Sequence, residues 1–157
     1  MPEMSSVIAN QWLLVPLLGA VIYFDLRLMR LPNVLAVLFV LVFLVSLPWL
    51  PGWRDAGFQL LAAAIVFALG LAANAGKLVG GGDVKVLAAL VLNIPTDALL
   101  LFFGLLCGAL FFGILVLELV RRRVSPPTGW RALDEKKGRF PVGLSIGLAG
   151  LAHIAMS

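Results

Sequence analysis

The chain has 157 residues, of which 62% are hydrophobic and 13% are charged, and its formal net charge is +4. This composition excludes an ordinary water-soluble domain, and apolar runs of about 18 residues or more recur along the whole length. We therefore expect a single integral membrane domain covering residues 1–157. One cysteine, Cys107, and one histidine, His153, are too few for a structural zinc site or a histidine-based triad within one chain.

Six apolar runs, separated by glycine, proline and charged residues, predict an all-α protein with six membrane-spanning helices. Their approximate ranges are 7–25, 33–49, 56–75, 83–94, 97–119 and 140–156. The fourth run is short, because ~12 residues of helix cover only ~18 Å of a hydrocarbon core that is ~30 Å thick. We therefore expect the backbone of Gly80, Gly81 and Gly82 to enter the membrane in a non-helical form, beside protein or a water-filled cavity.

The basic residues predict the orientation of these helices. All Lys and Arg residues except Arg54 lie after the first, third and fifth runs, and such loops stay in the cytoplasm. Both termini are then expected outside, with Asp25 and Asp83 on the cytoplasmic side. The long basic loop, residues 121–139, either anchors the topology on anionic lipid or touches a substrate or partner. The basic residues lack the aromatic spacing expected of nucleic-acid binding.

Two acidic residues lie at the edges of apolar runs. Asp25 ends the first run and Asp83 opens the fourth, where an ionised group costs several kcal/mol unless it has a partner or a polar cavity. Each alone has an ordinary explanation: an interfacial ion pair of Asp25 with Arg27 or Arg30, and a favourable helix N-terminus for Asp83. Together they suggest more, because two carboxylates in one cavity can share a proton, as in aspartic proteases.

Such a pair predicts peptide hydrolysis. The ionised carboxylate takes a proton from the attacking water, and the protonated carboxyl donates to the carbonyl oxygen or the leaving nitrogen. This chemistry needs no metal, cofactor or covalent intermediate. Gly80 and Gly82 are expected to supply positive φ angles and close backbone approach, so that an extended substrate lies beside Asp83. A glycine-rich turn before a helix can also bind phosphate, but Asp83 would repel that anion.

Three motifs in register resemble one family. Asp25 is followed by LPN at Leu31–Asn33, GGGDVK covers Gly80–Lys85, and RFPVGLSIGLAG covers Arg139–Gly150. This combination is similar to the type IV prepilin peptidases, which are intramembrane aspartyl proteases with a GxGD motif. The match is closest to their short branch, which serves tight-adherence (Flp-type) pili.

The resemblance implies that Asp25 and Asp83 are the catalytic pair and that Gly80 and Gly82 are the motif glycines. It also implies a substrate: a pilin-like precursor with a short basic leader and a hydrophobic helix, cut at the cytoplasmic face of a bacterial inner membrane. Precursor and membrane lipid are then the expected partners. Larger family members carry a methyltransferase activity and a domain with paired CxxC motifs. This chain has a single cysteine, so we expect cleavage without N-methylation.

The remaining motif residues have supporting interpretations. Pro32 and Asn33 suit the start of the second helix. Lys85 either acts on an aspartate through space or marks the cytoplasmic edge. Pro141 and Gly143 are candidates for an unwound, strand-like substrate rest at the start of the last run.

Two other functions fit part of this pattern. Intramembrane acids beside broken helices also mark ion pathways, which makes a small proton- or ion-coupled transporter one alternative. A non-catalytic membrane scaffold of a secretion complex is the other. The two acids lie near one face and no internal repeat is visible, which favours the peptidase.

Overall fold

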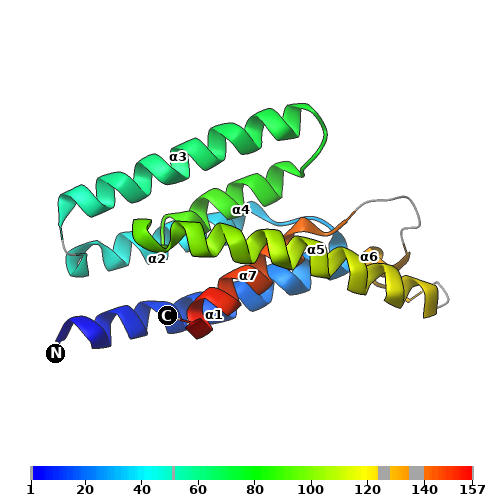
Figure 1. The fold of residues 1–157 in the computed structure, drawn as a ribbon, viewed down its shortest axis with the longest axis horizontal. Helices are drawn as coiled ribbons and strands as arrows, with labels where there is room; N and C mark the ends of the chain where they lie inside the picture. Colours follow the sequence, from blue (N-terminus) through cyan, green and yellow to red (C-terminus); the bar gives the residue numbers. More distant parts are fainter. Residues whose placement is uncertain (1, 51, 124–127, 135–139, 157) are drawn as a thin grey trace.

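The computed structural model describes residues 2–50, 52–123, 128–134 and 140–156, which form helices and no strand (Figure 1). This confirms the predicted all-α class. The α-helices are α1 (Pro2–Leu28), α2 (Asn33–Ser46), α3 (Trp53–Ala75), α4 (Gly81–Val91), α5 (Leu99–Arg123), α6 (Arg131–Asp134) and α7 (Val142–Met156). Two short 3-10 helices, η1 (Leu47–Trp49) and η2 (Thr96–Ala98), lie in the connections.

Each of the six predicted apolar runs corresponds to one α-helix, and the helix of the fourth run is short, as expected, at 11 residues. The helix α6 was not predicted. Two helical runs, α3 and the continuous run Thr96–Arg123, are long and apolar enough to cross a membrane, whereas α2 and α7 are apolar but shorter. These two helices agree with the membrane protein that the composition of the sequence predicts. Six crossings and their orientation stay a prediction.

The helices run roughly along the long axis of the molecule (Figure 1). The α1–α2 turn, the α3–α4 turn and α6 lie at one end, and both chain termini lie toward the other. Asp25 is three residues from the end of α1, and Asp83 is the third residue of α4. The chain path therefore brings both acids to the end that carries α6.

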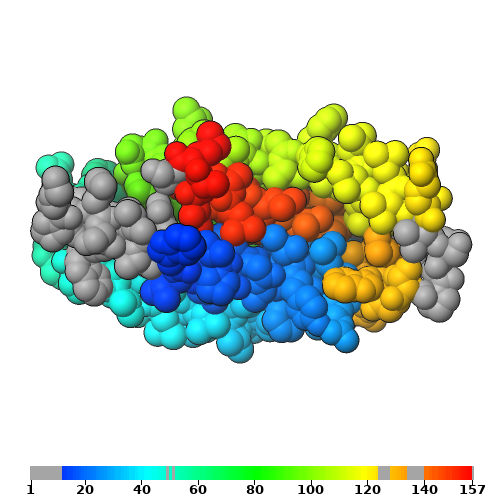
Figure 2. Space-filling model, turned by 90° about the horizontal axis from the view of Figure 1, so that it is seen from below, coloured from blue at the N-terminus to red at the C-terminus, as the bar shows by residue number. Residues whose placement is uncertain are grey.

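Helix α7 lies between α1 and α5 (Figure 2). Its face toward α1 is built from Gly143, Gly147 and Gly150, and a Cβ atom at any of them would overlap an α1 side chain. Small residues of this kind let helix backbones approach closely in a membrane. On the α5 side, the Ser145 hydroxyl donates to the carbonyl of Ala109 at 3.1 Å. This packing fixes the start of α7 beside the end of α1.

The short helix α4 packs against α2, α3 and α7. Its side chains Val86 and Val91 are fully buried, and Gly70 of α3 leaves room for Val84, which would be 2.6 Å from a Cβ there. At its far end, the Asn93 side-chain amide donates to the carbonyl of Phe39 in α2 at 3.0 Å. The helix that carries Asp83 is therefore held on several sides.

Candidate active site

Asp25 is buried, with only 3% of its surface exposed, and the first turn of α7 holds its carboxylate. The backbone N–H of Leu144 donates to Asp25 Oδ2 at 2.7 Å, and the backbone N–H of Gly143 donates as well. The first N–H groups of a helix have no partner within it and carry partial positive charge, so they suit a carboxylate. Among the described residues, Asp25 forms no ion pair with Arg27 or Arg30, and the Arg27 guanidinium lies against Tyr23.

Asp83 is half-buried and is held by its own helix. Gly80 is the N-cap of α4, and its backbone N–H donates to the Asp83 carboxylate, three residues further on. A side chain at the third helical position that reaches back to the N-cap N–H is the second half of a capping box. A Cβ atom at Gly80 would be 2.6 Å from Asp83 Oδ2, so the carboxylate occupies the space that the glycine leaves.

The two carboxyl groups lie toward the same end of the bundle, and the charge of Asp83 acts on Asp25. The turn that follows α1 fixes their relative position. A Cβ atom at Gly82 would be 2.8 Å from the carbonyl oxygen of Leu31, so the start of α4 lies directly on the backbone of this turn. The segment connecting α1 to α2 therefore supports the helix that carries the second aspartate.

Two expectations about the glycines before Asp83 were wrong: that Gly80 and Gly82 have positive φ angles, and that residues 80–82 are non-helical. Gly80 has φ −69° and ψ 139°, and the described residues with positive φ are Met29, Lys77 and Gly129. Gly81 and Gly82 are already helical, and the non-helical stretch covers residues 76–80. The physical reason is that the first turn of α4 must be regular for the Gly80 N–H to cap Asp83. The glycines therefore serve close packing, as at Gly82, rather than unusual torsion angles.

A side-chain hydrogen bond links the start of α2, at Pro32 and Asn33, to Lys85 of α4. Pro32 is the N-cap of α2, which begins at Asn33 as expected. The Lys85 ammonium donates to Asn33 Oδ1 at 3.1 Å, and no described contact joins it to either aspartate. Lys85 therefore acts on the arrangement of α2 and α4.

The structure alters the expected substrate rest. Pro141 is buried and precedes α7, but the helix begins at Val142, so Gly143 is helical and lies against Asp25. Within the described residues, the unwound start comprises only Phe140 and Pro141. The Asp25 side chain fills the space next to Gly143, so a substrate strand has no room there. A role of Pro141 beside a substrate stays a prediction.

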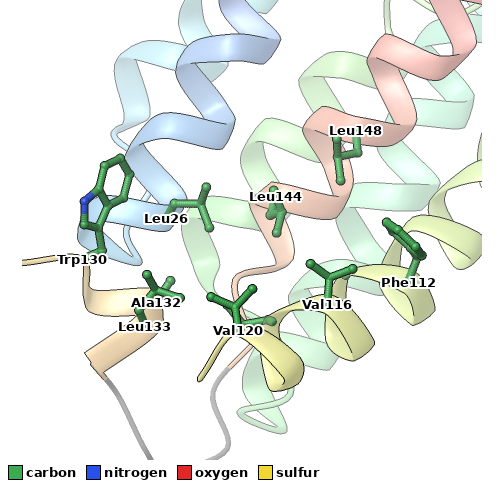
Figure 3. A pocket seen from close by; sticks show the side chains of 11 residues that line it. Leu26, Phe112, Val116, Val120, Trp130, Ala132, Leu133, Leu144 and Leu148 are labelled. Atoms are coloured by element: carbon green, nitrogen blue, oxygen red, sulfur yellow. The ribbon is translucent and has the colours of Figure 1, made fainter. Parts of the chain in front are cut away.

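An apolar cavity of about 290 Å³ is lined by Leu26, which follows Asp25 in the sequence, and by side chains of α5, α6 and α7 (Figure 3). Leu144, which donates to Asp25, points into this cavity from α7, and Trp130, Ala132 and Leu133 close it from the α6 side. Arg121 fixes α6 in place by donating twice to the Ala132 carbonyl, at 2.9 and 2.7 Å. Part of the 121–139 loop is thus a cover for this end of the bundle. Residues 124–127 and 135–139 of the loop lie outside the described residues.

Sequence reasoning did not find two contributors to the site. One is the Leu144 N–H, and the other is the Leu31 carbonyl that receives Gly82. A proline just before a helix start, as at Pro141, was the available signal for the first, because free N–H groups follow such a start. No sequence signal identifies the second, since it depends on how two distant turns pack.

Comparison with known families agrees with this geometry. The model of the type IV leader peptidase family matches residues 12–117, which include both aspartates and their neighbouring motifs. The chain belongs to the type IV leader peptidase family. Helix α7, which holds Asp25 in place, lies outside the matched residues. No curated protein and no solved structure matches the chain.

We expect Gly143→Ala to lower leader peptidase activity by about 10- to 100-fold. The added Cβ would lie 2.8 Å from Asp25 Cγ, so the carboxylate must move away from its backbone donors. The measurement is the rate of precursor cleavage at equal protein concentration in membranes. Gly104→Ala is the control, because nothing lies within 4 Å of a Cβ there. Equal activity of the two variants would show that the start of α7 does not position Asp25.

Proposed function

We propose that this chain is an aspartic endopeptidase that removes the short basic leader from pilin-like precursors. It works at the cytoplasmic face of a bacterial inner membrane, without N-methylation, and serves pili of the tight-adherence type. One observation carries the catalytic part. Asp25 from α1 and Asp83 from α4 lie toward the same end of the bundle, the charge of Asp83 acts on Asp25, and backbone N–H groups hold each carboxylate.

The pair supplies both proton transfers of hydrolysis. The ionised carboxylate accepts a proton from water while the water oxygen attacks the scissile carbonyl carbon, and the protonated carboxyl donates to the carbonyl oxygen. The tetrahedral intermediate then releases the amine, which receives a proton from the pair. The products are a leader with a new carboxylate and a mature protein with a new amino terminus. The backbone donors from α7 and Gly80 keep both carboxyl groups oriented through the cycle.

The proposed substrate fits the proposed membrane orientation. A precursor with a cytoplasmic N-terminus and one hydrophobic helix has its leader junction at the cytoplasmic surface. Six crossings with both termini outside would place Asp25, Asp83 and α6 at that same surface. The basic residues at this end, among them Arg121, Arg122 and Arg123, support this orientation.

A labelling experiment tests the orientation. In a Cys107→Ala background, we expect Arg131→Cys to react with a membrane-impermeant maleimide only from the cytoplasmic side, and Asp55→Cys only from outside. Arg131 starts α6, and Asp55 lies in the first turn of α3, at the opposite end of the molecule. The reverse labelling would put both aspartates on the wrong side for a basic cytoplasmic leader.

Co-expression tests the activity itself. The chain is produced together with a tagged pilin-like precursor, and conversion is followed by immunoblot and by mass spectrometry of the new amino terminus. We expect one cut between leader and helix, a free rather than methylated amine, and undiminished cleavage in EDTA. Absence of conversion with an inserted enzyme would contradict the proposed activity. Loss in EDTA that a metal restores would contradict the two-carboxylate mechanism.

A further inference from the structure

A groove that the proposed mechanism does not use runs between α2 and α3, with α4 as its floor. Its cavity volume is about 620 Å³, and several of its wall side chains, including Val37, Leu60 and Phe67, are exposed at the surface. All three helices contribute alanines to the lining: Ala36, Ala63, Ala64, Ala88 and Ala89. A groove lined by small apolar residues lets another helix approach closely within a membrane.

The groove has one polar end, formed by Asn33 and Lys85. Lys85 is exposed, and its ammonium donates to Asn33 Oδ1, but the described contacts pair it with no carboxylate. Lys85 follows Asp83 by two residues, which is ~3 Å along the helix axis. Lys85 leaves α4 on a different face from Asp83, so the polar end of the groove lies at the same end of α4 as Asp83 and carries the positive charge of Lys85.

The dimensions of the groove fit one face of a helix. Its floor extends from Lys85 to Leu92, a rise of ~10 Å, or about two helical turns. The volume divided by this length gives a mean cross-section of roughly 60 Å², whereas a whole helix ~10 Å in diameter has roughly 80 Å². The cross-section of the groove is thus wide enough for most of a helix, and it is wider than a single extended hydrocarbon chain requires.

We propose that this groove binds the hydrophobic helix of the precursor, with Lys85 paired to an acidic residue in the first turn of that helix. The inference rests on the proposed function and names the docking surface for its substrate. The N-terminus of a helix carries partial positive charge, so Lys85 alone would repel it. An acid in the first turn complements both charges. The residues that precede this turn then pass Asp83, which places the scissile bond beside the carboxylates.

Cross-linking tests the docking. The photoreactive residue p-benzoylphenylalanine replaces Ala64, which lines the groove, in full-length protein that also carries Asp83→Asn to prevent turnover. The matched control carries it at Ala68, which is exposed one turn further along α3 and does not line the groove. The probe is a synthetic precursor with a short lysine-containing leader and a ~20-residue Leu/Ala helix that has Glu in its first turn. Both proteins are reconstituted in phosphatidylcholine and phosphatidylglycerol vesicles and irradiated.

We expect a precursor adduct at position 64 that is at least about 10-fold more abundant than at position 68, identified by mass spectrometry. A lipid adduct at position 64, equal adducts at both positions, or no adduct at position 64 would overturn the docking proposal. Cleavage of the same probe by the parent protein is measured separately. Cleavage without a selective adduct would contradict the docking proposal and support the peptidase activity. A selective adduct without cleavage would support the docking proposal and contradict the peptidase activity.

A charge exchange tests the role of Lys85. We expect Lys85→Glu to reduce the position-64 adduct at least about 10-fold with the Glu-containing probe, and to restore it with a probe that has Lys in its place. This rescue requires a direct pairing, because a variant that merely misfolds would bind neither probe. Unchanged adduct with the Glu-containing probe, or failure of the exchanged probe to restore it, would overturn the assignment to Lys85.

Discussion

Asp25→Asn and Asp83→Asn are each expected to lower the rate of precursor cleavage by about 10²- to 10⁴-fold or more. An amide cannot accept a proton from water, so a variant with either carboxyl replaced loses one of the two proton transfers. Each asparagine still has an oxygen that can accept from the backbone donors, Leu144 for position 25 and Gly80 for position 83. The variants should therefore insert and fold like the parent protein.

The measurement is single-turnover cleavage by purified protein in vesicles, with protease resistance as the test of folding. Asp97→Asn is the matched control, because Asp97 is exposed in η2 and lies at the far end of α4 from the candidate site. It should cleave at the parental rate. Normal cleavage by either Asp25→Asn or Asp83→Asn would show that the pair does not perform the chemistry.

The three glycines before Asp83 are expected to differ in their tolerance of alanine. At Gly82 the new Cβ would lie 2.8 Å from the Leu31 carbonyl oxygen, a backbone atom, so the start of α4 must shift. A displacement of ~1 Å of the Asp83 carboxylate lowers the rate by ~100-fold. At Gly81 the nearest atom is Asn74 Nδ2 at 3.6 Å, an ordinary contact, and Gly81→Ala should stay within about threefold of the parent.

Gly80→Ala separates positioning from folding. Its backbone angles suit alanine, and the clash is with Asp83 Oδ2 alone, so the carboxylate rotates away while the helix stays in place. We expect at least about tenfold loss of activity with only the small loss of thermal stability that one broken capping hydrogen bond causes, whereas Gly82→Ala should lose activity and more of its stability. Precursor conversion and melting of all three variants are compared at equal expression. Equal loss in all three would indicate general disruption of the turn, and parental activity in all three would mean that other contacts position Asp83.

The pattern of apolar runs is sufficient to predict much of the fold. Long runs without charges predict the helices directly, and the break at Asn93 and Pro95 predicts the short α4. Asp25 lies at the end of the first predicted helix, and Asp83 lies at the start of the fourth. Because successive helices reverse direction, both acids are predicted at the same end of the bundle. Pro32 likewise marks the start of α2.

Other features depend on tertiary contacts that a single sequence does not show. The N–H donors to Asp25 come from α7, more than a hundred residues later, and that contact exists because Gly143, Gly147 and Gly150 lie against α1. The glycines before Asp83 led us to expect unusual torsion angles, but the structure uses their lack of a Cβ atom for close packing instead. Glycine alone cannot distinguish these two uses. The partner of Lys85 is also on a separate helix, 52 residues away.

The central claim is that Asp25 and Asp83 act as one catalytic unit, and the most direct test is the single-turnover rate of the double variant Asp25→Asn, Asp83→Asn. Residues that act as a unit are strongly non-additive, since removal of one already abolishes the step that both perform. We therefore predict that the double variant cleaves the precursor no more slowly than the slower of the two single variants. A double-variant loss equal to the product of the two single losses would contradict the account, because it would mean that the two carboxylates contribute independently.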